Sequence, residues 1–358
     1  MTILLRRLWP VLATIFLFSA ASALAQRPVP FKDPANVARV RAGLDTFLRL
    51  CADTAIAVER IDEFASDEFA HEVRQGGKAP VWFEPQSWRI GEIVSLGAGD
   101  SLAMVNVISR ADSLPMFGYF DIDWTFFMRL SKGGWKVSAL RRLNGFEESV
   151  EMLRFLDTAS SYPASLKPEM VRENSAMLLS NDQLRRHFAE HAADFQALAA
   201  EFTRRDSLQV VARVGNRVMQ FNHHVIDWGM AAHDIPQQVI DEYMRSASPE
   251  EQARIQSQLR IAEKMRRDGN DSLAKILKKK KIAVARVEKV VSMMHDLRVV
   301  FINSQLPWKG AVQLTVAGKM DNAVGYIYSP KGGLPLISPA EYFYLEDLGN
   351  GWWIFRAT

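Results

Sequence analysis

The chain has 358 residues, a formal net charge of +3 at pH 7 and one cysteine, Cys51. A near-neutral charge gives no electrostatic argument for nucleic-acid binding. A single thiol excludes an internal disulfide, and the length is sufficient for two or more domains.

Residues 1–25 have the three parts of a secretory signal peptide. Arg6 and Arg7 form a basic start, an apolar stretch follows, and Ala23-Leu24-Ala25 is a small-x-small cleavage site. The apolar stretch is short for a membrane span and contains Pro10. We therefore expect cleavage after Ala25, no transmembrane segment in the mature chain, and a periplasmic or secreted location.

Residues 33–145 are predicted to form an α+β domain. Asp33-Pro34 begins a helix whose apolar stripe ends at Cys51, so we expect Cys51 to be a small buried hydrophobic residue. In 121–130, Ile122, Trp124, Phe126, Met128 and Leu130 share one face and Asp123, Thr125 and Arg129 the other. The predicted strands cover residues 88–96, 101–109, 121–130 and 135–143, the last two joined by an SKGG turn.

This order, helices and then an antiparallel meander ending in FFMRLSKGGWKVSALRR, resembles the NTF2-like (cone-shaped α+β) superfamily. The resemblance covers roughly residues 33–145 and implies a sheet curved around the helices to enclose a pocket. Some members are isomerases or dehydratases, such as ketosteroid isomerase, and many exported members only bind or scaffold. An isomerase of this kind needs a carboxylate base and hydrogen-bond donors inside an apolar cone.

Three residues are candidates for such a pocket. Glu92 stands in register with Trp88, Ile90 and Val94, which makes it the candidate catalytic acid or base. Asn106, between Met104 and Ile108, and Trp124 are candidate binding residues. The alternative for both polar groups is an edge position or a satisfied structural hydrogen bond.

Residues 146–168 are predicted to be a linker and residues 169–300 a helical segment. Ser180 caps a helix that contains HFAEH, residues 187–191. His191 falls inside the apolar stripe of that helix and His187 at its edge, which favours a packed helix. The alternative is an inverted zinc-protease motif, with His187 and His191 as ligands and a third ligand from another helix.

A second histidine group, FNHHVIDWGMAAHD, follows. His223 is a candidate metal ligand, with Asp227 four residues away, and Trp228 is a candidate binding residue. The alternative is a histidine-rich helix end before Pro236. No spacing here completes a ligand set.

A helical hairpin is predicted next. Ser248-Pro249-Glu250-Glu251 is a strong helix start, and RRDGND, 266–271, is expected to turn the chain into a second helix. The returning arm has a basic stretch, 275–289. This stretch is interpreted as a solvated helix face, with an acidic partner or a lipid surface as the alternative.

Residues 307–358 are predicted to form a small aromatic sheet. Its four strands cover 307–318, 322–329, 340–348 and 352–357, with a tight hairpin at Asn350-Gly351. With the HFAEHAADFQAL helix, this ending is similar to small exported bacterial proteins of unknown function, and that similarity implies no activity. The segment 169–358 is expected to form one helical and sheet domain.

The sequence favours an exported, non-catalytic binding or scaffold protein, without a cofactor, for an unidentified small molecule or protein partner. The first alternative is an enzyme of the NTF2-like isomerase or dehydratase type that uses the N-terminal cone. The second is a zinc hydrolase acting through the HFAEH helix.

Overall fold

The computed structural model describes residues 28–358 except 52–58, 77–87, 98, 111–120, 144–145, 159–166, 204–207, 215–216, 223, 227–239, 242–243, 246–247 and 320–321. The predicted signal peptide, His223 and Trp228 therefore lie outside the described residues. Within these ranges, no helix combines the length and the apolar composition that crossing a membrane requires.

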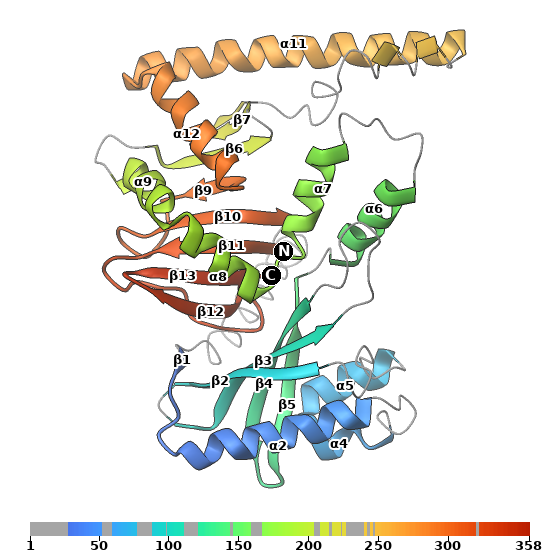
Figure 1. The fold of residues 1–358 in the computed structure, drawn as a ribbon, viewed down its shortest axis with the longest axis vertical. Coiled ribbons are helices and arrows are strands. Elements are labelled where there is room, and N and C mark those ends of the chain that lie inside the picture. Colours follow the sequence, from blue (N-terminus) through green and yellow to red (C-terminus); the bar gives the residue numbers. More distant parts are fainter. Residues whose placement is uncertain are drawn as a thin grey trace, which may run out of the picture. The chain divides into compact units, whose positions relative to one another are not determined.

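The chain is a mixed α+β protein with antiparallel sheets, as predicted (Figure 1). The helices are α2 (Pro34–Cys51), α4 (Ile61–Phe64), α5 (Asp67–Gly76), α6 (Phe146–Thr158), α7 (Lys167–Ala176), α8 (Asn181–Glu190), α9 (Ala192–Thr203), α11 (Pro249–Lys280) and α12 (Val284–Asp296). The strands are β1 (Pro28–Val29), β2 (Trp88–Leu96), β3 (Leu102–Arg110), β4 (Asp121–Ser131), β5 (Gly134–Arg141), β6 (Val210–Val214), β7 (Arg217–Phe221), β8 (His224–Val225), β9 (Phe301–Asn303), β10 (Val312–Lys319), β11 (Asn322–Tyr328), β12 (Tyr342–Gly349) and β13 (Trp352–Ala357).

The chain divides into two compact units. Unit 1 contains the residues up to Asn144 together with Pro335–Glu346 and Phe355–Thr358. Unit 2 contains Gly145–Leu334 and Asp347–Ile354. The division lies beside the predicted domain end at 145, but unit 1 also includes two C-terminal segments that the sequence analysis assigned to the second domain.

Unit 1 is built on an antiparallel sheet in the order β1-β2-β3-β4-β5, with α2, α4 and α5 packed against it. The predicted β4 face is confirmed for Trp124, Phe126 and Met128, which join the core. Leu130, at the strand end, is 45% exposed. Cys51 is fully buried in this core, and burial raises the pKa of its thiol to about 12, so the prediction of a buried hydrophobic residue is confirmed.

The second sheet has eight strands in the order β12-β13-β11-β10-β9-β6-β7-β8. All four predicted C-terminal strands are present, as β10 to β13. Asn350 and Gly351 have φ of 54° and 79°, the left-handed values that a two-residue type I′ hairpin requires. The segment 169–300, predicted to be helical, also contains three short strands, β6, β7 and β8, which the sequence analysis did not predict. Their runs VVARV and RVMQF are too short to stand out as period-2 patterns between long helices.

The predicted helical hairpin is also wrong, because α11 is one helix that continues through RRDGND. A single glycine costs a helix only about 1 kcal/mol, which good helix formers on both sides offset. The helix ends instead at Lys281, whose φ of 56° and ψ of 36° are left-handed. Its predicted start is confirmed, since Ser248 and Glu251 form a capping box before Pro249.

Candidate functional site

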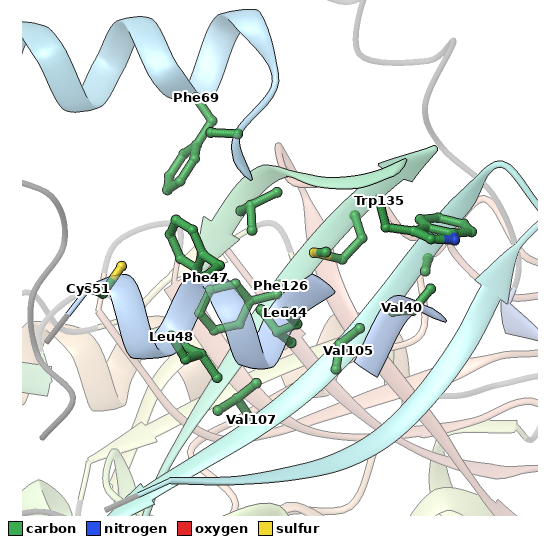
Figure 2. Packing of buried hydrophobic residues seen from close by; sticks show 14 of the residues in the cluster. Val40, Leu44, Phe47, Leu48, Cys51, Phe69, Val105, Val107, Phe126 and Trp135 are labelled. Atoms are coloured by element: carbon green, nitrogen blue, oxygen red, sulfur yellow. The ribbon is translucent and has the colours of Figure 1, made fainter. Parts of the chain in front are cut away.

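The helix-facing side of the unit 1 sheet is lined by closely packed apolar side chains (Figure 2). The ring of Phe47 from α2 lies 6.1 Å from Phe126 of β4 and 6.2 Å from Phe69 of α5, measured between centroids. These are ordinary distances for packed aromatic pairs. The side chains of α2, α5, β3 and β4 therefore form one packed apolar core on this side of the sheet.

Trp124 is a core residue of this packing. It is 1% exposed, its Nε1 donates a hydrogen bond to Ser109 Oγ at 2.9 Å, and the Arg142 guanidinium lies 4.6 Å from its ring centroid. Because both its face and its polar edge are engaged by the protein, the geometry gives Trp124 a structural role.

Glu92 does not lie on the apolar face that the register predicted. A β-bulge between Ile90 and Ile93 shifts the pairing of β2 with β3, so Ile90 and Ile93 both pack toward the core and Glu92 is exposed. A bulge inserts one residue and reverses the alternation that follows it. An unbroken period of two predicts the opposite face for this carboxylate, so the prediction for Glu92 is wrong.

Asn106 is buried, but on the sheet face opposite Val105 and Val107. It is 4% exposed, and its Nδ2 donates a hydrogen bond to Asp123 Oδ1 at 3.0 Å. Its Oδ1 is buried and has no hydrogen-bond partner within the described residues. Arg356 NH2 lies 3.6 Å from Asp123 Oδ2, and both side chains are almost fully buried.

We call Asn106, Asp123, Tyr344, Glu346 and Arg356 the buried polar cluster of unit 1. Tyr344 donates a hydrogen bond to Glu346 Oε2 at 2.6 Å. Burial is the main cause that raises the pKa of Tyr344 well above its usual 10, and the charge of Glu346 adds to it. Burial lowers the pKa of Arg356, while the charges of Asp123 and Glu346 oppose that shift. The buried Asp123 and the half-buried Glu346 therefore compensate the charge of the buried Arg356 guanidinium.

Sequence reasoning found one member of this cluster, Asn106, and missed the others. Asp123 was placed on the face away from the apolar stripe, which is correct, but that face is buried as well. Arg356 stands in an aromatic strand, WWIFRA, and an arginine in such a run is the signal that could have indicated a buried partner.

The HFAEH segment is not one continuous helix. α8 ends at Glu190 and α9 begins at Ala192, because His191 has φ of −123° and ψ of 18°. The break changes the direction in which the following side chains point, so the predicted burial of the two histidines is reversed. His187 is the histidine that packs inward, whereas the His191 side chain is 39% exposed and lies 3.7 Å from Asp194 Oδ2.

His187 forms part of a hydrogen-bonded chain. Tyr326 donates its hydroxyl hydrogen to the Leu184 carbonyl at 2.9 Å, and His187 Nδ1 lies 3.0 Å from the same hydroxyl oxygen. A neutral His187 must then carry its proton on Nδ1. Its Nε2 is buried without a hydrogen-bond partner in the described part of the chain. Burial lowers the pKa of His187 to about 4, with smaller contributions from Arg298 and His191.

The surroundings of His187 are aromatic. Phe195 lies 5.5 Å from His187, and Phe188 lies 5.1 Å from Trp352, between ring centroids. Trp352 Nε1 donates to Gln196 Oε1 at 3.1 Å. Among the described residues, no group of three or more His, Cys, Asp or Glu side chains is placed to hold a metal ion. The geometry here is that of a packed core between α8, α9 and the sheet.

Comparison with known proteins gives no relative: no family model, no curated protein and no solved structure matches this chain.

Proposed function

We propose that this chain is an exported, non-catalytic binding or scaffold protein whose N-terminal domain has the NTF2-like cone fold. The order of helices and antiparallel strands in unit 1 supports that fold. The observation that carries the functional proposal is the side-chain packing of the helix-facing side of the sheet, where Phe47, Trp124 and Phe126 are each at most 1% exposed.

The ionisable groups of unit 1 support the same proposal. Catalysis by a cone pocket requires a carboxylate or other ionisable group beside a space that a substrate enters. Glu92 is exposed, and Asp123 is engaged by Asn106 and Arg356 on the other face of the sheet. Neither carboxylate lies beside the apolar rings that would hold a substrate.

The test compares the mature chain, residues 26–358, with Trp124→Ala and Glu92→Gln. An apolar fluorescent naphthalene sulfonate should bind the native chain weakly, and Trp124→Ala should bind it more tightly because it opens a cavity. A β,γ-unsaturated ketosteroid should not be isomerised by the native chain. Turnover that Glu92→Gln abolishes at an unchanged unfolding midpoint would overturn the proposal.

Export is tested separately. The proposal expects a mature N-terminus at Gln26 in the fraction outside the inner membrane, and Ala25→Arg should leave the precursor unprocessed. Mass spectrometry of the fractionated protein measures both, and an unprocessed native chain would contradict the expected location.

A further inference from the structure

The junction between α11 and α12 is basic and contains no acidic residue. Three residues separate the two helices, which meet at an angle (Figure 1). From Ser272 to Val287 the sequence holds six basic residues and no aspartate or glutamate. One of the six, Arg286, is paired with Glu201 at 3.0 Å. The others are exposed lysines that form no ion pair with the described residues, namely Lys275, Lys278, Lys279, Lys280 and Lys281.

The fold directs these lysines to solvent. Leu277 is 1% exposed, so the face of α11 that carries it is covered. Lys275 and Lys279 stand two residues before and after Leu277, so each lies about 200° around the helix from that face. Lys281 ends the helix with φ of 56° and ψ of 36°, and Ile282 N donates a hydrogen bond to the Leu277 carbonyl at 2.9 Å. The end of α11 is therefore a closed turn surrounded by positive charge.

An exposed apolar tip adjoins the lysines. Val284 is 52% exposed, and its neighbours Ala283 and Ala285 are exposed as well. Ala283 is the N-cap of α12, where no side chain caps the helix and the first turn has no acidic residue. The N–H groups of this turn add partial positive charge beside the lysines. We call Lys275 together with Lys278–Ala285 the basic corner of unit 2.

The combination of ammonium groups and an apolar tip matches the surface of an anionic bilayer. Lysine is a hydrated point charge on a flexible stem, which suits a plane of headgroup phosphates better than a single bidentate ligand. An aliphatic side chain at the same place can leave water by entering the boundary between headgroups and acyl chains. A free phosphate ion or a nucleic-acid backbone would engage the lysines but offers no apolar phase to Val284.

We propose that the basic corner is a docking surface for a bilayer that contains anionic phospholipid. The lysines lie at the headgroup phosphates and Val284 at the boundary with the acyl chains. Binding is peripheral and reversible, because it rests on electrostatic attraction and one aliphatic side chain. The inference goes beyond the proposed binding or scaffold function. It requires neither export nor the NTF2-like fold, so its failure would leave that proposal unchanged.

Vesicle co-sedimentation of the mature chain, residues 26–358, tests the electrostatic part. Vesicles with about 30% phosphatidylglycerol should bind the chain, whereas pure phosphatidylcholine vesicles should not. Raising NaCl to about 0.5 M should release the chain, because salt screens charges at a surface. Lys278→Gln combined with Lys279→Gln should weaken binding at least about tenfold, since each lysine near an anionic surface contributes about fivefold.

The matched control neutralises two exposed lysines on other elements, Lys132→Gln combined with Lys309→Gln. It should retain binding within about twofold, since these lysines lie outside the basic corner. A native chain that does not bind the anionic vesicles overturns the proposal. Equal losses in the two double variants would do the same, because binding would then depend on net charge alone.

A fluorescent label tests whether the apolar tip enters the bilayer. Nitrobenzoxadiazole attached to Val284→Cys should become brighter on anionic vesicles, and the buried Cys51 remains unlabelled in the folded chain. The control is the same label on Ile261→Cys, in the middle of α11, where the native side chain is 58% exposed. This label should change little. Equal brightening at both positions would overturn the assignment to the corner, and no brightening at Val284 would overturn its placement in the bilayer.

A soluble polyanion separates lipid from an acidic protein partner. Polyglutamate carries the charge of an acidic protein segment but has no apolar phase. At equal negative charge it should bind the chain more weakly than anionic vesicles do, and Val284→Ser should weaken binding to the vesicles alone. Tighter binding to polyglutamate than to the vesicles would assign the basic corner to an acidic protein partner and overturn the lipid proposal.

Discussion

At the scale of single residues, His187 and Arg356 stand out because burial lowers the pKa of each side chain. Burial, with smaller contributions from Arg298 and His191, lowers the pKa of His187 and favours its neutral form. Arg356 is kept in the interior beside Asp123 and Glu346, whose charges oppose the effect of burial on its pKa. Each has a consequence for stability that can be measured.

His187 should make unit 2 less stable in acid. Its pKa is about 4 in the folded chain and 6.5 in the reference state, so the unfolded chain binds more protons between these values. The contribution of His187 to the free energy of unfolding is therefore fully present above pH 6.5 and falls as the pH decreases toward 4. Because solvent screens this partly exposed side chain, we expect the free energy of unfolding to decrease by about 1–2 kcal/mol.

His187→Asn keeps a donor for Tyr326 but cannot titrate. Urea unfolding of this variant from pH 7 to pH 4 should therefore lose that part of the pH dependence. His191→Asn is the matched control and should retain it, because His187 remains in place. A native-like slope in His187→Asn would assign the acid sensitivity to other groups.

Removing one partner of the buried ion pair should be more damaging than removing both. Arg356→Met leaves the Asp123 carboxylate buried without the guanidinium beside it, at a cost of about 3–5 kcal/mol. Adding Asp123→Asn removes the uncompensated charge, so the double variant should recover part of this loss. Guanidinium unfolding of both single variants and the double variant measures the coupling energy, and strictly additive losses would show that the two charges do not interact.

At the scale of elements, local irregularities determine which residues face the core. The bulge in β2 exposes Glu92, and the break at His191 separates α8 from α9. A third irregularity lies between Thr315 and Ala317 of β10, where the register with β11 shifts. Beside it, Gly325 of β11 comes so close to β10 that an added Cβ would lie 2.0 Å from the Leu314 carbonyl oxygen.

Gly325→Ala should therefore destabilise unit 2. The methyl group cannot be accommodated unless the two strands separate, and overpacking of this kind costs about 2–3 kcal/mol. Gly133→Ala is a suitable control, since its Cβ would meet only the end of the Lys136 side chain at 3.8 Å. Differential scanning calorimetry should show a lower midpoint for the first variant alone, and equal midpoints would show that the strands adjust without strain.

At the scale of the whole molecule, unit 1 is assembled from distant parts of the chain. Phe355–Thr358 belongs to the same unit as the first 144 residues. Through Arg356 this segment supplies a countercharge to Asp123 of β4. Thr358 N donates a hydrogen bond to the Glu341 carbonyl within the same unit. The last four residues are therefore part of the N-terminal unit and not a tail of the second.

Deleting residues 355–358 should loosen unit 1. Hydrogen exchange should become faster in β3 and β4, because Asp123 loses its buried countercharge and Asn106 shares that loss. Deleting Thr358 alone is the control, which removes only the two hydrogen bonds that Thr358 N and Oγ1 donate to the Glu341 carbonyl. Unchanged protection of β3 and β4 after the longer deletion would contradict the assignment of this segment to unit 1.

Several local features of this protein were predictable from its amino-acid sequence. The alternation in β4, the helix starts at Ser180 and Ser248 and the tight hairpin at Asn350-Gly351 were predicted correctly, because each depends on residues within one turn or one hairpin. The α+β class follows from these elements. The burial of Cys51 was predictable for the same reason, since its helical stripe is continuous.

Which polar groups meet, and which positions face inward, depended on contacts between distant parts of the chain. The pairing of Asp123 with Arg356 joins residues 233 positions apart (356 − 123 = 233), and no local pattern encodes such a contact. The β2 bulge, the His191 break and the unbroken α11 are choices between conformations of similar local energy. Differences of about 1 kcal/mol per residue separate these conformations, so packing and burial, which contribute more, decide among them.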